Sequence, residues 1–67
     1  MAKNNALGRN LLALRGKRKL NQRSLALLAG IQPSNLCRYE KGQKTPTLST
    51  LAKLAKALGT SPSILLR

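Results

Sequence analysis

Glycine and proline residues cut this chain into short segments, and no other feature of the sequence limits its fold as strongly. The dividing residues are Gly30, Pro33, Gly42, Pro46 and Gly59. Glycine often follows the last turn of a helix because it adopts the left-handed backbone conformation at little cost, and proline suits the first turn. Leu and Ala dominate between these stops, whereas Val and Phe are absent. This composition favours helices over a half-buried sheet, so the sequence predicts an all-α fold.

The spacing of apolar residues between the stops predicts five helices. The first has Asn4 or Asn5 as its cap and ends near Lys17, while Asn21 and Thr47 are favourable N-caps for the second and fourth. The other four predicted helices cover residues 22–29, 33–41, 48–58 and 62–66. We expect a single domain, because a chain of 67 residues builds a core worth only about 3–5 kcal/mol.

Each predicted helix carries apolar residues at helical spacing, and we expect these to face a common core. The expected inward residues are Leu7, Leu11 and Leu14 in the first helix, Leu25, Leu28 and Ala29 in the second, Leu36 and Tyr39 in the third, and Leu48, Leu51, Leu54, Ala55 and Leu58 in the fourth.

The charge balance is extreme, with 13 Lys and Arg residues against one acidic residue and a formal net charge of +12. The basic residues are spread from Lys3 to Arg67 instead of forming a tail, so the folded domain carries the positive field. The expected partner is therefore a polyanion.

The residue types also argue against acid–base catalysis and metal binding. The chain has no His and no Asp, and its sole carboxylate is Glu40, so proton transfer by a pair of side chains is not available. The single Cys37 has no second thiol for a disulfide and no His for a zinc site, which fits a reducing cytoplasm. We expect no enzyme activity, metal, cofactor, small-molecule ligand or membrane span, and residues 1–20 lack the unbroken apolar stretch of a signal peptide.

The stretch from residue 22 to residue 39 is the most specific signal. Two helices that cross steeply after a short turn need a small side chain at their closest approach and a left-handed residue where the backbone reverses. Ala26 and Gly30 meet these two demands. Leu25, Ile31, Leu36 and Tyr39 are expected to fill the wedge between the helices.

This whole set in register resembles the helix-turn-helix domain of the Cro and lambda-type phage repressor family, the XRE-like DNA-binding domains. The matching residues are Gln22, Leu25, Ala26, Gly30, the E-K-G at 40–42 and the P-T-L-S-T-L at 46–51. The resemblance implies a compact five-helix bundle of the lambda repressor-like type with its helix-turn-helix at about 22–41. It also implies sequence-specific binding to double-stranded DNA, usually as a homodimer on a palindromic operator.

The predicted third helix would then be the recognition helix in the major groove. The family pattern implies base contacts from Pro33, Ser34, Asn35 and Arg38, of which Asn35 lies nearer the DNA backbone. Arg38 is the main expected determinant, since a guanidinium can pair with guanine O6 and N7. Related repressors often have Gln in place of Pro33 and a Ser or Thr cap in place of Gln32, so Pro33 offers only an apolar contact.

Phosphate contacts are expected from the start of the second helix and from basic residues around the groove. The expected residues are Gln22, Arg23, Lys17, Arg18, Lys19, Lys41 and Lys44. Lys3 lies on an N-terminal arm, residues 1–4, which is predicted to be flexible. The resemblance further implies a structural ion pair between Arg15 and Glu40. The resemblance also implies that residues 62–66 can form a two-fold contact. The residues assigned either to the core or to this contact are Leu58, Ile64, Leu65 and Leu66.

Several functions stay open on the sequence. Activators of this family often carry acidic residues on the second helix, and Arg23 there favours a repressor. An antitoxin or a restriction-modification controller would share the same features. A non-specific cationic protein that binds nucleic acid or an anionic membrane is the alternative outside this class. Tyr39 is the one aromatic residue, so the stacking platform of a single-stranded nucleic-acid binder is missing.

Overall fold

The computed structural model describes residues 6–67, and within this range the chain forms five α-helices. They are α1 (Ala6–Lys17), α2 (Gln22–Ala29), α3 (Pro33–Lys41), α4 (Leu48–Leu58) and α5 (Pro62–Leu65). The predicted helix boundaries are confirmed, with α5 one residue shorter than expected. The predicted arm at residues 1–4 and the caps Asn4 and Asn5 lie outside the described residues.

The helix ends follow the predicted chemistry. Asn21 Oδ1 accepts a hydrogen bond of 2.8 Å from the backbone N–H of Ser24, and Thr47 Oγ1 accepts one of 3.2 Å from that of Thr50. The glycines that follow α2, α3 and α4 have φ of 72°, 76° and 70°, the left-handed region in which a Cβ atom is unfavourable. Helices α2 and α4 are thus closed at both ends by local residues.

Helix α1 ends without a glycine, which the sequence did not reveal. Lys19 has φ of 57° and donates from its N–H to Gly16 O at 3.0 Å, while Leu20 N–H donates to Arg15 O at 3.0 Å. This is the hydrogen-bond pattern that usually places glycine at the left-handed position. A lysine therefore occupies a backbone conformation that costs a residue with a Cβ about 1 kcal/mol or more.

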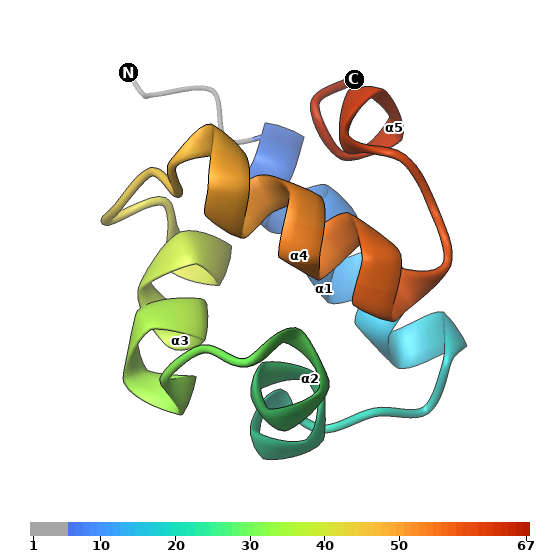
Figure 1. Cartoon of the computed structure of the whole chain (residues 1–67), viewed down its shortest axis with the longest axis vertical. Helices are drawn as coiled ribbons and strands as arrows, with labels where there is room; N and C mark the ends of the chain where they lie inside the picture. Colours follow the sequence, from blue (N-terminus) through green and yellow to red (C-terminus); the bar gives the residue numbers. More distant parts are fainter. Residues whose placement is uncertain (1–5) are drawn as a thin grey trace.

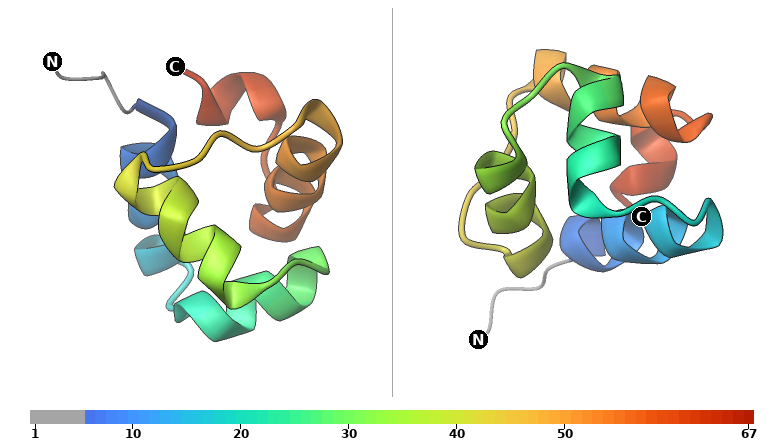
Figure 2. Two further views of the ribbon diagram at one scale, coloured as in Figure 1. Left: turned by 90° about the vertical axis from the view of Figure 1, so that its left-hand side faces the viewer. Right: turned by 90° about the horizontal axis from the view of Figure 1, so that it is seen from below.

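The core consists mainly of leucines, together with three alanines and Tyr39. Figure 1 shows the helices arranged around this core, and the right-hand view of Figure 2 shows that α1 and α4, which overlap in Figure 1, lie on opposite sides of it. Helix α2 packs against both α3 and α4, and α1 packs against α3 and α5. The buried apolar side chains are Leu11, Leu25, Ala26, Ala29, Leu36, Tyr39, Leu51, Leu54, Ala55, Leu58 and Leu65.

Two of the expected core residues are instead exposed. Leu28 is 62% exposed because the buried arc of α2 passes through Leu25, Ala29 and Ala26, and a step of about 100° per residue places Leu28 outside it. Leu48 is 77% exposed because it is the first residue of α4, where Pro46 takes the buried position. The prediction that these two leucines face the core was wrong.

Candidate nucleic-acid interface

The turn between α2 and α3 determines how α3 is oriented relative to α2. Gly30 N–H donates to Leu27 O at 3.2 Å and Ile31 N–H donates to Ala26 O at 2.9 Å, which closes α2 while the chain reverses. Ala26 is fully buried at the crossing, as predicted, and Ile31 packs against the core. Gln32 is extended and makes no side-chain cap, so α3 begins directly at Pro33.

Helix α3 has one buried face and one polar exposed face. Leu36 and Tyr39 point into the core with 0% and 5% exposure. Ser34, Arg38 and Lys41 are exposed on the rest of the helix, and the left-hand view of Figure 2 looks onto α3 as it runs across that side of the bundle. Pro33 is also exposed, whereas Asn35 and Cys37 are half-buried. We call the exposed residues Pro33, Ser34, Arg38 and Lys41 together with Asn35 the α3 surface.

A loop residue fixes part of the α3 surface. Lys44, in the connection between α3 and α4, donates from Nζ to Asn35 Oδ1 at 3.2 Å. The bond leaves the amide nitrogen of Asn35 as a donor toward solvent. The sequence placed both residues at the interface but gave no sign that they contact each other, since the geometry of the loop decides it.

The predicted ion pair between Arg15 and Glu40 is present and belongs to a larger network. Arg15 Nε donates to Glu40 Oε2 at 2.7 Å and Arg15 Nη2 donates to Glu40 Oε1 at 3.1 Å. Arg15 Nη1 also donates to the carbonyl of Leu20 at 3.0 Å, in the turn before α2. Gln22 Nε2 donates to Glu40 Oε1 at 2.8 Å. One carboxylate thus joins α1, the start of α2 and the end of α3.

The network also determines the charge of the exterior. The side chain of Glu40 is 5% exposed, and it is the sole acidic residue of the sequence. The eleven other Lys and Arg residues among residues 6–67 are all exposed. The described surface is therefore strongly cationic, including the face on which α3 lies.

The basic residues predicted to contact phosphate do not all lie near α3. Arg23 lies on α2, Lys41 on α3 and Lys44 just beyond it, and each is exposed. Lys17 and Lys19 are exposed at the end of α1. Arg18 is different, because its guanidinium lies against Gly59 at the C-terminal end of α4, so close that a Cβ atom at that glycine would clash with it.

Two of the four residues assigned to either the core or a two-fold contact are core residues. Leu58 and Leu65 are 1% and 0% exposed, so both are core residues and their side chains are not available to a second copy. Leu66 is 56% exposed and Ile64 is half-buried. Asn10 donates to the carbonyl of Leu65 at 2.8 Å, which holds α5 against α1.

The family profile of HTH_3, helix-turn-helix, matches residues 11–65. The chain belongs to this family. Among residues 6–67, no helix of this HTH_3 domain has the length and apolar character needed to cross a bilayer. The family membership makes the chain a DNA-binding domain of the transcription-regulator type.

Several known proteins similar to this HTH_3 domain are regulators, and a part of the hydroxypropylphosphonic acid epoxidase of S. wedmorenis is also similar, with a TM-score of 0.81 at 31% identity over 90% of this chain and 32% of that chain. The chain is 39% identical over 59 residues to an uncharacterized HTH-type transcriptional regulator of Haemophilus influenzae. This match covers 88% of the present chain but only 60% of the length of that protein. The restriction-modification controller C.AhdI of Aeromonas hydrophila superposes with a TM-score of 0.87 at 37% identity, over 90% of this chain and 91% of the controller. The DNA-binding domain of the P22 c2 repressor superposes with a TM-score of 0.86 at 32% identity. This match covers 90% of the present chain and 79% of the repressor domain.

Proposed function

We propose that this protein is a sequence-specific, double-stranded DNA-binding transcriptional regulator, and that it acts as a repressor. The observation that carries the proposal is the α3 surface, a polar helix face flanked by exposed basic residues such as Arg23 and Lys44. An α-helix fits the width of the major groove, and phosphates attract the basic residues around it. The absence of His and Asp and the engagement of Glu40 with Arg15 support a protein that binds without catalysing.

Base recognition falls to residues in the first two turns of α3. Arg38 is exposed and can present two parallel N–H donors to guanine O6 and N7, worth about 1–3 kcal/mol of discrimination. Ser34 adds a less selective hydroxyl, and Pro33 supplies an apolar contact such as that with a thymine methyl group. Asn35, whose carbonyl oxygen accepts from Lys44, offers its amide nitrogen to an acceptor on a base or a phosphate.

Phosphate contacts would orient α3 in the groove without reading sequence. Gln22 lies at the N-terminus of α2, where exposed backbone N–H groups favour an anion, and one of its amide hydrogens points to Glu40. The exposed basic residues assigned to this role are Arg23, Lys17, Lys19, Lys41 and Lys44. Arg18 contributes at longer range, because its guanidinium lies against Gly59.

Repression would follow from occupancy of a promoter by two copies on a palindromic operator. A palindrome presents equivalent half-sites about 34–36 Å apart, which a homodimer reaches with its two α3 helices. Leu66, exposed beside α5, is the residue best suited to a two-fold contact, with Ile64 next to it. Such a regulator would act in the cytoplasm.

The similarity to C.AhdI favours one function within this class. That controller superposes with a TM-score of 0.87 at 37% identity, and the control protein C.SmaI of Serratia marcescens is 39% identical over 62 residues. A restriction-modification controller is therefore the specific form of regulator that we rank second, after a general repressor. An antitoxin has no comparable observation in its favour.

The test is selection of preferred duplexes from a random pool at about 150 mM salt, where weak phosphate-only binding is reduced. We expect a palindromic site with a guanine in each half-site. Arg38→Ala should lose preference at that one base pair, whereas Lys17→Ala, a matched loss of one charge at the end of α1, should weaken all duplexes alike. Equal behaviour of the two variants, or no enriched site at all, would refute sequence-specific binding through α3.

A further inference from the structure

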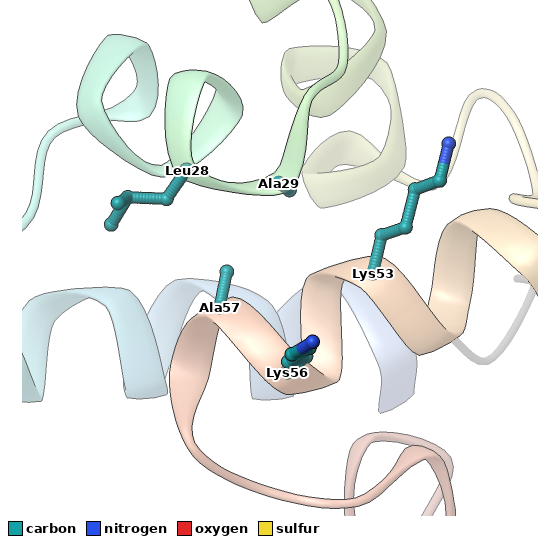
Figure 3. Close-up of a pocket in the computed structure, with 5 residues that line it drawn as sticks. All are labelled: Leu28, Ala29, Lys53, Lys56 and Ala57. Carbon is teal, nitrogen blue, oxygen red and sulfur yellow. The ribbon is translucent and has the colours of Figure 1, made fainter.

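A hollow lies between the C-terminal end of α2 and the second half of α4, and no residue of α3 lines it. Its lining residues are Leu28, Ala29, Lys53, Lys56 and Ala57, and its volume is about 410 Å³ (Figure 3). We call it the α2–α4 hollow. The residues proposed for DNA contact lie elsewhere, so a function of the hollow is separable from DNA binding.

One side of the α2–α4 hollow is apolar. Leu28 extends from α2 on the side across from Ala57, and Ala29 lies next to it on the same helix (Figure 3). Leu28 is 62% exposed, and it is one of five leucines among residues 6–67 that are more than half exposed. It differs from the others in lining this hollow together with Ala29 and Ala57, and exposed apolar surface that is contiguous marks sites of interaction. Burial of this side of the hollow by an apolar group of a ligand would therefore stabilise the complex.

The other side is basic and unneutralised. Lys53 and Lys56 rise from α4 three residues apart, a spacing at which like charges on a helix repel each other. The sole acidic side chain of the sequence, Glu40, is on α3 and engaged with Arg15 and Gln22. An Asp or Glu side chain at this edge of the hollow must therefore come from another molecule.

These two sides together select the occupant. A second copy of this chain has no exposed acidic side chain to offer and would bring its own positive charge. A DNA backbone would meet the lysines but leave Leu28 uncovered. We infer that the α2–α4 hollow binds an acidic amphipathic segment of a partner protein, with an aliphatic side chain against Leu28 and Asp or Glu side chains at Lys53 and Lys56.

The experiment is selection of binders from a displayed library of random peptides about 16 residues long against the full chain at about 150 mM salt, where distant surface charges are screened. We expect enriched peptides that combine Asp or Glu with Leu, Ile, Met or Phe at helical spacing. Their affinities are then measured by fluorescence anisotropy against four variants whose helix content is checked by circular dichroism.

The variants form two matched pairs. The double change Lys53→Glu with Lys56→Glu is compared with Lys17→Glu with Lys19→Glu, which alters net charge equally at residues that do not line the hollow. Leu28→Ala is compared with Leu48→Ala, which removes another exposed leucine. We expect the charge change in the hollow to weaken peptide binding about tenfold more than its control, and Leu28→Ala to weaken it about fivefold while Leu48→Ala has no effect.

Three results would overturn the inference. The first is a selection that enriches no acidic and apolar combination. The second is peptides that bind the hollow variants as well as their controls, which would mean attraction to net charge alone. The third is a duplex affinity that falls more with the Lys53 and Lys56 changes than with the Lys17 and Lys19 changes, because the hollow would then contact DNA.

Discussion

Removal of the Glu40 carboxylate should unfold much of this domain, and the network of Arg15 gives the magnitude. Glu40→Ala deletes three hydrogen bonds of 2.7, 3.1 and 2.8 Å and leaves the guanidinium of Arg15, whose side chain is 16% exposed, without its counter-charge. Breaking one side of a largely buried pair costs about 3–5 kcal/mol. A core of this size supplies about the same amount in total, so the variant should be mostly unfolded at 25 °C.

The paired replacement distinguishes a buried charge from a general loss of packing. Arg15→Met combined with Glu40→Leu removes both charges together and keeps apolar volume, so it should recover most of the lost stability. About 1 kcal/mol should stay lost, because the carbonyl of Leu20 then has no Arg15 donor. Urea denaturation followed by circular dichroism measures all three proteins. If Glu40→Ala lies within about 0.5 kcal/mol of the parent, or the double variant is no better than the single one, the network does not hold these helices together.

Three other changes have defined outcomes. Lys19→Gly should raise the free energy of unfolding in urea by about 1 kcal/mol because φ of 57° strains a residue with a Cβ, while duplex affinity falls by the loss of one charge; an unchanged or lower stability would contradict this. Gly30→Ala should lower stability by about 1–2 kcal/mol although nothing lies within 4 Å of its added Cβ, since the cost is in the backbone at φ of 72°, and a neutral result would show that the turn relaxes. Leu66→Glu should leave the thermal midpoint nearly unchanged, because the side chain is 56% exposed, and should abolish pairing on a two-site duplex in sedimentation; pairing that persists would exclude Leu66 from the contact.

The local features of the fold were predictable because each is decided within a few residues. Asn21 and Thr47 cap their helices, and Gly30 turns left-handed, for reasons present in the sequence itself. The positions of Leu28 and Leu48 were not predictable in this way. Their exposure depends on which arc of a short helix meets its neighbours and on where a helix begins relative to the bundle, and both are tertiary facts.

The candidate site divides in the same manner. The ion pair of Arg15 and Glu40 followed from the family resemblance, since both residues match the pattern. The bond from Gln22 to Glu40 and that from Lys44 to Asn35 were missed, because they join side chains whose approach is set by loop and helix packing. The stretch of charge in the sequence suggested equal roles for Lys17, Arg18 and Lys19, yet Arg18 alone lies against Gly59.

The inward position of Glu40 has a consequence for self-assembly. Since the formal net charge is +12 and the one acidic side chain is largely buried, two free copies that approach each other repel electrostatically, and this repulsion is strongest at low ionic strength. The phosphates of a DNA duplex bound by both copies would neutralise this positive charge. Under the proposed function, we therefore expect pairing to be cooperative with loading onto DNA, with monomers free in solution and dimers on an operator.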